Sequence, residues 1–516
     1  MIRIAGGGAR ILAVLVLWEL AARATAGAFV IAAPSQIALY IAGHAGLLWR
    51  AFCTTGAAAA QGFLWGNLAG VALALAAVLV PRSERMLSVA ALLVFCLPLV
   101  ATGPVLRILY GPGTGPQVTL AALAVYYTTF RPVLAGLRAM PQSWSDLLRS
   151  YGRGAPAILW HVRLPAALPY LAAGLQIAAP AAFLGAMVGE FTGAEQGLGV
   201  LTLRALRSLD LPATWSIALI AALASTAAFR AIGAAGKRLD LAPPEILLAA
   251  PAEPARRRRA AALAEALLTA LLILAAWAGS MALFGLPRFF AKRPGDVWDY
   301  LVAGPGAAEH REVLGAAMGQ TLAMALPGYL AGLLAGAGLA AALALWPRLA
   351  AWILPAAVTL RAVPIIATAP LIVWALGRGA AGTIAVVAVM IFFPTLVACR
   401  QGLARAPRAV LDIFDSYSAG PVRRLLGAEL PAMLPAFFAS ARMAVPAAIL
   451  AVTTAEWLAT GRGIGALMAM TASTSDYRML WSAIALTGIA ALACHGAVAA
   501  AERAVLARTA PEQLAR

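Results

Sequence analysis

Long apolar runs constrain the fold of this chain more than any other sequence feature. Twelve runs, six in each half, are each long enough to cross about 30 Å of hydrocarbon as a helix. Apolar residues fill them continuously rather than in alternation, which excludes a membrane β-barrel. We therefore expect an all-α polytopic membrane protein with about twelve transmembrane helices. The runs lie near residues 11–31, 55–80, 86–106, 116–137, 165–189, 211–232, 261–285, 321–346, 349–373, 380–399, 431–455 and 479–501.

Composition supports a membrane protein and excludes several other classes. Hydrophobic residues make up 62% of the chain and charged residues 12%, whereas soluble proteins are roughly half apolar and about a quarter charged. An ordinary cytosolic enzyme, a disordered tail and a collagen-like fibre are therefore excluded. The net charge of +18 does not predict a nucleic-acid partner, because basic residues between apolar runs are typical of cytoplasmic loops. The four cysteines are interpreted as small buried hydrophobes, and the four scattered histidines predict no metal site.

The distribution of basic residues predicts the orientation. In the first half, twelve Arg and Lys residues fall on one side of the predicted spans and four on the other. The positive-inside rule then places both termini in the cytoplasm. We interpret residues 11–31 as a retained span rather than a cleaved signal peptide, and the run Arg256–Arg259 as an orientation anchor in a cytoplasmic linker over residues 246–260.

The sequence repeats itself at a constant offset of 266 residues. Glycine, proline and charged residues match in this single register, for example Gly66 with Gly332 and Pro98 with Pro364. We expect two repeats, residues 1–245 and 261–516. An even number of spans in each repeat predicts a parallel pseudo-symmetric pair, related by an axis along the membrane normal and able to enclose one pathway.

The segment between the fourth and fifth spans of each repeat predicts a helical hairpin. We expect Ser143 or Ser145 to cap its first helix, with Asp146 at the positive end of the helix dipole. Gly154 and Gly420 are expected to supply a turn with positive φ, and Pro156 and Pro421 to stand in the first turn of the second helix. Apolar residues on the first helix predict a docking surface for a soluble partner, the alternative being a hairpin that rests on lipid headgroups. They are Leu147, Leu148, Tyr151, Ile413, Phe414 and Tyr417.

These hairpins resemble the coupling loop of ATP-binding-cassette importer permeases. The family pattern is E-A-A, three residues, Gly, nine residues and I-x-L-P. Asp146 and Asp412 stand at the position of its Glu, whereas Ser418 replaces the Gly that Gly152 matches. The resemblance implies that hairpins 143–164 and 409–430 dock two cytoplasmic ATPase subunits. The residues it implicates in coupling are Asp146, Tyr151, Gly152, Gly154, Leu164, Pro165, Asp412, Tyr417, Ser418, Gly420, Leu430 and Pro431.

Two further segments resemble the nitrate/sulfonate/taurine type of these permeases. Residues 455–465 match its A-E…G-x-G-[LI]-G stretch, and residues 360–364 match its L-R-A-x-P segment. The resemblance implies a type I importer fold made of two fused permease units in a bacterial inner membrane. It also implies a periplasmic or extracellular substrate-binding protein as a partner.

No nucleotide site is apparent in the sequence. Residues 233–238 lack the spacing of a phosphate-binding loop. We therefore expect that the chain is not an enzyme and that it holds no cofactor. ATP–Mg is expected to be bound by the partner ATPase.

Two other classes remain as alternatives. A secondary transporter can also be built from two parallel repeats, but it needs ionisable groups deep in the membrane. Glu19, Glu190 and Glu456 are few for that purpose, and the hairpins would have no role. A membrane-embedded enzyme or a scaffold is the third class, for which no catalytic cluster is visible.

Candidate gate and pathway residues form a separate group. Their members are Glu190, Gly197, Gly199, Arg361, Arg442, Glu456, Gly463 and Gly465. The two glutamates are predicted to hold the outer gate or to contact the binding protein, the alternative being solvated loop carboxylates. The two arginines lie in apolar stretches, where an unpaired cation is costly. They favour a small anion such as nitrate, a sulfonate or taurine as the substrate. The alternative role for the arginines is structural, by pairing to helix-end carbonyls or by snorkelling to an interface. The alternative substrate is a vitamin precursor such as a pyrimidine.

Overall fold

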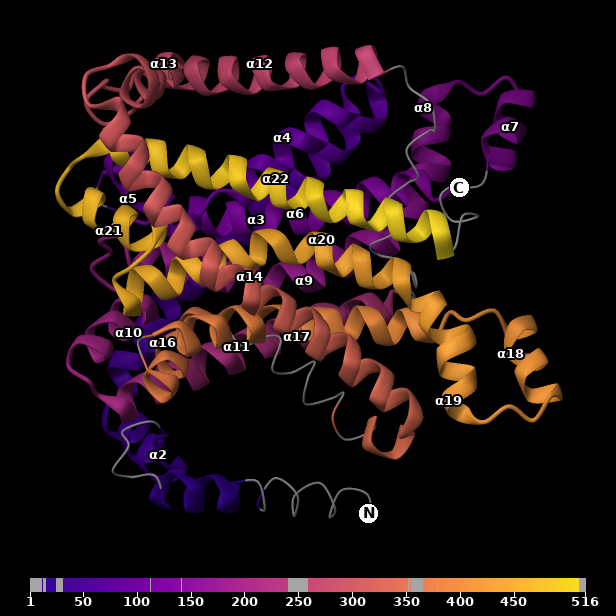
Figure 1. Cartoon of the computed structure of the whole chain (residues 1–516), viewed down its shortest axis with the longest axis horizontal. Helices are drawn as coiled ribbons and strands as arrows, with labels where there is room; N and C mark the ends of the chain where they lie inside the picture. The colour runs from indigo at the N-terminus through magenta and orange to yellow at the C-terminus, as the bar shows by residue number, and fades with distance from the viewer. Residues whose placement is uncertain are drawn as a thin grey trace.

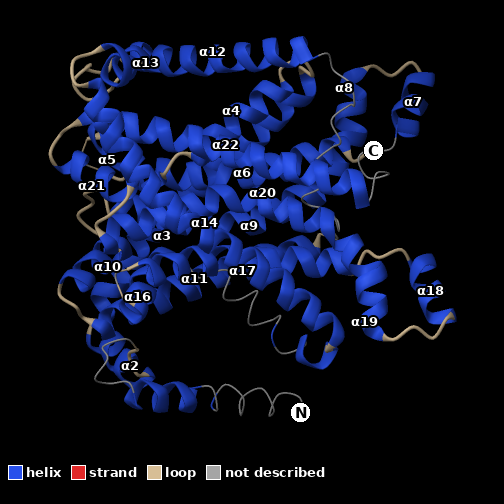
Figure 2. Ribbon diagram, in the orientation of Figure 1, coloured by secondary structure: helices blue, strands red, loops and turns tan. Residues whose placement is uncertain are grey.

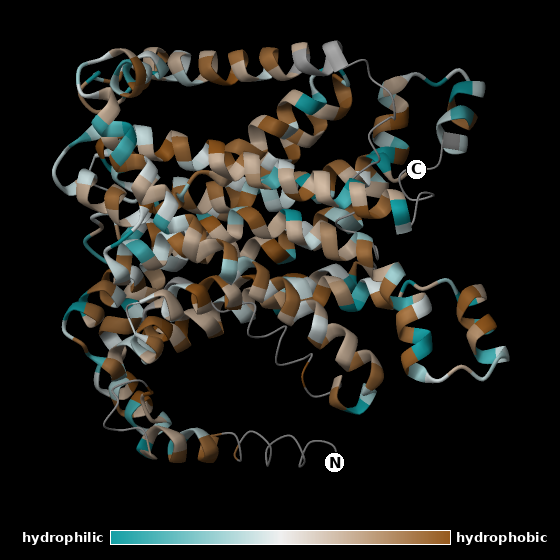
Figure 3. Cartoon of the chain, viewed as in Figure 1, coloured by the Kyte–Doolittle hydropathy of each residue, from teal (hydrophilic) through white to brown (hydrophobic). Residues whose placement is uncertain are grey.

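The computed structural model describes residues 12, 15–24, 31–111, 113–140, 142–239, 259–350, 353, 365–377 and 379–509. Within these ranges every regular element is a helix (Figure 2). The predicted linker at 246–260 and Arg361 lie wholly or mostly outside the described residues. Figure 3 shows hydrophobic residues along the helices, while hydrophilic residues gather at the helix ends and in the hairpins.

The first repeat contains a bundle of long helices and several short ones (Figure 1). Its elements are α2 (Pro34–Gly43), α3 (Ala45–Leu79), α4 (Glu84–Cys96), α5 (Leu99–Tyr110), α6 (Gly115–Arg138), α7 (Gln142–Ser150), α8 (Ala155–Ile158), the π turn η2 (Leu159–Arg163), α9 (Leu164–Glu190), α10 (Leu198–Arg207) and α11 (Leu211–Arg238).

The second repeat follows the same order. Its elements are α12 (Arg259–Leu283), α13 (Pro294–Trp298), the π turn η3 (Asp299–Ala303), α14 (Ala307–Leu345), α16 (Ile365–Leu376), α17 (Ala380–Leu403), α18 (Arg408–Ser416), α19 (Pro421–Arg424), the π turn η4 (Leu425–Glu429), α20 (Leu430–Ala455), the π turn η5 (Glu456–Thr460), α21 (Ile464–Ser473) and α22 (Tyr477–Thr509).

The described residues contain nine helices long and apolar enough to cross a membrane, or ten if a bent pair counts as one span. The all-α polytopic class is thus confirmed, and the span expected near 86–106 is interrupted. It is the bent pair, in which α4 and α5 meet at 91°. Pro98 explains the break, because the residue before a proline is forced out of the helical region, and Leu97 is extended (φ −64°, ψ 135°). The expected spans at 11–31 and 349–373 lie only partly within the described residues.

Equivalent glycines bring the central helices of each repeat into close contact. A Cβ atom added to Gly66 of α3 would lie 2.6 Å from the carbonyl oxygen of Ala122 in α6. A Cβ atom added to Gly332 of α14 would lie 2.6 Å from the carbonyl oxygen of Ala388 in α17. Both pairs stand at the 266-residue offset, and small residues at such crossings are the usual basis of helix packing in membranes. The sequence repeat is therefore a structural repeat.

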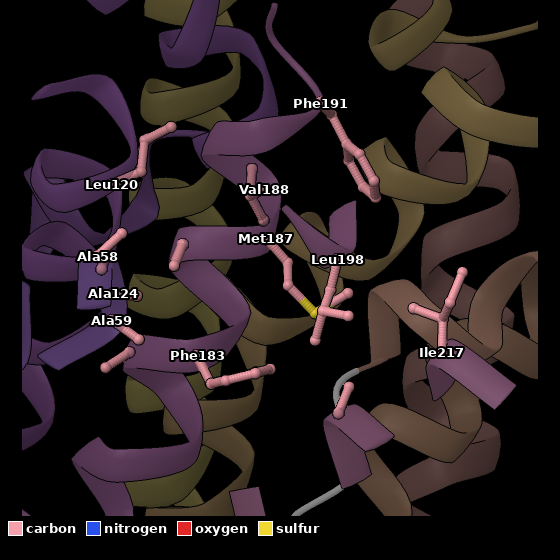
Figure 4. Packing of buried hydrophobic residues seen from close by; sticks show 14 of the residues in the cluster. Ala58, Ala59, Leu120, Ala124, Phe183, Met187, Val188, Phe191, Leu198 and Ile217 are labelled. Atoms are coloured by element: carbon pink, nitrogen blue, oxygen red, sulfur yellow. The ribbon is translucent and has the colours of Figure 1, made fainter. Parts of the chain in front are cut away.

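Packing on these crossings builds a separate core in each repeat and a shared contact between them. In the first repeat, side chains of α3, α6, α9, α10 and α11 converge (Figure 4). The broken helix α4–α5 lies against α20 and α22 of the second repeat, while α16 contacts α9 and α11. Met443 of α20 and Leu492 of α22 pack into the cluster around Phe130 of α6. This contact between repeats is where a two-repeat transporter would enclose its pathway.

Candidate coupling hairpins, carboxylate caps and pathway

The first hairpin (residues 143–164) and the second hairpin (residues 409–430) project from the same end of the bundle (Figure 1). Pro156 and Pro421 stand in the first turns of α8 and α19, as expected. A π turn then joins each hairpin to a long helix, α9 or α20, which begins at Leu164–Pro165 or Leu430–Pro431. The chain runs from the hairpin into the bundle without a loop, so each hairpin is continuous with a long helix.

The positive-φ residues of the hairpins are not the expected glycines. Gly154 (φ −79°, ψ 179°) and Gly420 (φ −62°, ψ 160°) are extended, a conformation open to any residue. The left-handed positions are Gly152 (φ 71°) and Ser418 (φ 51°), which occupy the Gly position of the family pattern. Each lies just beyond the end of the first hairpin helix, where a left-handed residue is the usual terminator.

Backbone hydrogen bonds show that both first helices end in a Schellman motif. Arg153 N donates to Leu148 O at 3.0 Å, and Gly152 N donates to Arg149 O at 2.9 Å. In the second hairpin, the equivalent bonds run from Ala419 N to Phe414 O at 2.9 Å and from Ser418 N to Asp415 O at 3.0 Å. This pattern requires the left-handed residue at the second position after the helix. Gly154 and Gly420 come two residues later, which is why they are extended.

The expected N-terminal caps are also wrong. Helix α7 begins at Gln142, so that Ser143 and Ser145 lie inside it, and no acidic residue stands in its first turn. Asp146 instead lies 3.4 Å from Arg149 on the exposed surface. Helix α18 begins immediately after Pro407. Both helices therefore start next to the proline that precedes them, one turn earlier than expected.

Exposed aromatic side chains stand at equivalent positions on the two hairpins. Tyr151 is 76% exposed and Tyr417 is 83% exposed. Leu147 and Ile413 are also exposed, whereas Leu148 and Phe414 are half-buried. Large apolar side chains are therefore exposed at equivalent points of two hairpins at one end of the molecule.

At the opposite end of α9, a buried carboxylate caps α10. We call Thr55, Glu190 and residues 197–199 the first carboxylate cap. Thr55 Oγ1 donates to Glu190 Oε1 at 2.6 Å and accepts from Leu198 N at 2.9 Å, while Gly199 N donates to Glu190 Oε2 at 2.6 Å. Two N–H groups that the start of a helix leaves free are thereby satisfied.

The second carboxylate cap (Thr321, Glu456 and residues 463–465) repeats this arrangement at the start of α21. Thr321 Oγ1 donates to Glu456 Oε1 at 2.8 Å and accepts from Ile464 N at 2.8 Å, and Gly465 N donates to Glu456 Oε2 at 2.8 Å. Every partner stands at the 266-residue offset from its counterpart. The same interaction therefore holds α10 and α21 to the helices beside them.

Glycine is required in both caps. A Cβ atom added to Gly197 would lie 2.2 Å from the Glu190 carboxyl carbon, and one added to Gly463 would lie 2.1 Å from Glu456 Oε1. Both glycines also have positive φ (133° and 89°). Glu190 and Glu456 are only 2% and 3% exposed, so the alternative of solvated loop carboxylates is wrong. Their threonine partners are 135 residues away in the sequence, beyond the reach of any local motif.

Arg442 is paired inside the second repeat. Its guanidinium forms an ion pair with Glu502 of α22, and both side chains are largely buried. The first repeat has Gln176 and Gly236 at the equivalent positions, and Gln176 Nε2 reaches only the Phe229 carbonyl, at 3.4 Å. The partner of Arg442 is thus a carboxylate, rather than the helix-end carbonyls or interface expected as the alternative.

Sequence reasoning missed Arg131, a second arginine near the contact between repeats. It is half-buried in α6 and lies within electrostatic reach of Arg442 and of His495 in α22. Within the described part of the chain it has no hydrogen bond or ion pair. Two arginines against the single carboxylate of Glu502 leave a local surplus of positive charge. The signal that singled out Arg442, an arginine in an apolar run, would also have found Arg131.

Comparison with known proteins agrees with this duplicated architecture. The family of binding-protein-dependent transport system inner membrane components matches the chain twice, over residues 66–240 and 328–508. The chain belongs to this family. It carries two permease units in one polypeptide, as the resemblance implied, and family membership favours the importer over a secondary transporter, an enzyme or a scaffold.

Individual relatives are similar to single units of the permease. A probable ABC transporter permease protein of Haemophilus influenzae is 31% identical over 40% of this chain and 84% of its own length. The formylaminopyrimidine transport permease protein ThiX of Halalkalibacterium halodurans is 26% identical over 43% of this chain and 89% of its own. The putative aliphatic sulfonates transport permease protein SsuC of Escherichia coli is 27% identical over 25% and 48%. No solved structure matches the chain.

Proposed function

We propose that this permease forms the whole membrane pathway of an ATP-driven importer and docks one ATPase subunit at each hairpin. The observation that carries the proposal is the duplicated hairpin, in which an exposed tyrosine stands on a short helix joined without a loop to α9 or α20. ATPase docking would place the hairpins, and with them the end of α22, in the cytoplasm. A substrate-binding protein would then deliver solute at the opposite end, near α10 and α21.

In this proposal, the carboxylate caps connect the long helices that follow the hairpins to the opposite end of the bundle. Closure of the ATPase pair on ATP would move the hairpins, and α9 and α20 would transmit the movement as continuous helices. Glu190, at the far end of α9, holds α10, and Glu456, directly after α20, holds α21. Helices α10 and α21, at the outer end of the pathway, would therefore move together with the hairpins. Such rigid-body movement would alternate the pathway between two states. In this proposal, the caps serve as fixed joints of the outer gate.

A small anion is the substrate class that the charges favour. Arg131 lies within electrostatic reach of Arg442, whose paired carboxylate is Glu502. A surplus cation in a low-dielectric site attracts an anion more strongly than it would in water. An organosulfonate or a comparable oxyanion suits this field, and the similarity to an aliphatic sulfonates permease is in keeping with it.

A pyrimidine vitamin precursor is the second candidate. The specific observation in its favour is that the similarity to ThiX extends over 89% of that protein's length, whereas the similarity to SsuC extends over 48%. A pyrimidine is uncharged and would gain little from Arg131.

Reconstituted transport distinguishes these candidates. The permease would be purified with the ATPase that accompanies it, placed in vesicles and supplied with its binding protein and ATP. Uptake of taurine or an alkanesulfonate, competed by other oxyanions, is the expected result. Uptake of formylaminopyrimidine alone would refute the anion assignment, and the absence of any associated ATPase would refute the importer mechanism.

A further inference from the structure

The two hairpins differ in charge although they share one backbone pattern. The first hairpin contains one acidic residue and three arginines, for a net charge of +2, whereas the second contains three acidic residues and two arginines, for a net charge of −1. At the 266-residue offset, Arg149 corresponds to Asp415 and Arg163 to Glu429, so two positions reverse their sign. Arg153 corresponds to the uncharged Ala419. A soluble partner therefore meets two electrically different surfaces.

The second hairpin is held together internally by Arg424. Its Nη1 lies 3.3 Å from Asp415 Oδ1, and its Nε lies 3.1 Å from Glu429 Oε1. The arginine thus joins α18 to the π turn on the other side of the hairpin. Behind this ion-pair staple, the Phe414 ring packs so closely on Gly427 that an added Cβ atom would lie 2.6 Å from the ring.

The first hairpin cannot form the same staple. The position of Arg424 is taken by Ile158, which is buried, and both acidic partners are replaced by arginines. Arg149 makes only an exposed contact with Asp146 at 3.4 Å. Arg153 is exposed, and its guanidinium has no hydrogen bond or ion pair among the described residues. Its charges therefore face solvent and are open to a partner.

Backbone conformation explains why the staple belongs to the second hairpin. Both turns need a left-handed residue, and Gly152 provides it without steric cost. Ser418 has a Cβ atom, for which the same conformation is unfavourable. Asp415 precedes this turn and Arg424 follows it, so their ion pair ties its two sides together and opposes its opening.

We infer that the hairpins dock by different means: the first through its exposed arginines onto an acidic groove of an ATPase subunit, and the second through shape and apolar contact as a stapled, preorganised unit. The inference rests on the proposed function. Opposite charges across a contact steer association and lose strength in salt. Preorganisation lowers the entropic cost of docking and depends on salt only through the ion pairs inside the hairpin. If the two ATPase subunits are identical, the first hairpin is then the salt-sensitive contact.

A matched pair of double variants tests the role of charge. Arg149→Ala with Arg153→Ala removes two exposed positive charges from the first hairpin. As the control, Arg408→Ala with Arg423→Ala removes one charge directly before the second hairpin and one within it. The full permease, in phosphatidylcholine nanodiscs, would be titrated with its co-purifying ATPase between about 50 and about 300 mM salt. We expect the first variant to weaken binding about fivefold to tenfold and to flatten its salt dependence. The second should change affinity less than about twofold.

Other outcomes separate the inference from the proposed function. Equal effects of the two variants, or no effect of the first, would overturn the inference while ATPase binding itself upholds the function. Salt dependence that appears only when anionic lipid is added would assign the arginines to the membrane and also overturn it. Failure of the ATPase to bind the native chain would overturn both. Unchanged thermal unfolding of the variants excludes misfolding as the cause.

A rescue experiment tests the staple. Arg424→Ile gives the second hairpin the residue of the first and should weaken ATPase binding, most clearly at low salt, where the two lost ion pairs are least screened. Ser418→Gly in the same chain removes the unfavourable turn and should restore most of the lost affinity. No loss from Arg424→Ile, or a loss that Ser418→Gly does not reduce, would show that the ion pair does not preorganise the hairpin.

Discussion

Replacing Thr55 by valine tests whether the first carboxylate cap holds α10 in place. Valine keeps the shape of threonine but removes the hydroxyl that serves both Glu190 Oε1 and Leu198 N. A buried polar group left without a partner costs about 1–3 kcal/mol, so the start of α10 should lose about 2 kcal/mol or more of its stability against local opening. Since about 1.4 kcal/mol corresponds to a factor of ten, amide exchange at Leu198 and Gly199 should become roughly thirtyfold faster.

Hydrogen exchange followed by mass spectrometry can measure this effect with a control inside the same molecule. Peptides covering residues 195–201 should exchange faster in Thr55→Val, while the equivalent peptides over 461–467 in the second cap should not change. Thr55→Ser keeps the hydroxyl and should resemble the native chain. Unchanged exchange at 195–201, or an equal rise in both caps, would refute the local-cap reasoning.

Three further predictions concern the hairpin turn and the arginines. Gly152→Val should impair ATPase-coupled uptake because a β-branched residue resists positive φ, whereas Gly154→Val should be tolerated; equal loss would contradict this. Arg442→Gln should lower the unfolding temperature in detergent by leaving Glu502 buried and unpaired, and adding Glu502→Gly, which recreates the first repeat, should restore it. Arg131→Gln should reduce uptake of an anionic substrate with little change in ATP hydrolysis; unaltered uptake would remove Arg131 from the pathway.

Periodic and repeated features could be predicted from the sequence because they depend on many residues at once. The duplication, most of the spans and the position of the hairpins follow from runs of apolar residues and from one constant offset. The break at Pro98 could not be predicted in the same way. Pro104 and Pro132 lie inside helices, whereas Pro98 separates two helices at 91°. The presence of a proline therefore does not by itself tell whether a span is broken.

The position of a local turn depends on where the preceding helix ends, which the composition of the segment does not show. The positive φ falls at Gly152 rather than Gly154 because α7 ends at Ser150, and the turn position follows the end of the helix. The carboxylate caps were hidden for another reason, since Glu190 meets Thr55 only after folding. A signal was nevertheless present. Thr55 and Thr321 match in the same register as Glu190 and Glu456, and polar residues repeated within apolar spans indicate a shared structural role.

Joining two equivalent permease units in one polypeptide allows mutations to affect each unit separately. In an assembly of identical subunits, each genetic change arrives in both copies, so a charge reversal that benefits one contact is imposed on the other as well. Here Arg149 and Asp415 occupy corresponding places and carry opposite charge, which two identical subunits could not do. The two hairpins can therefore change independently. A substitution can disable one hairpin while the other, unchanged in the same molecule, serves as a control.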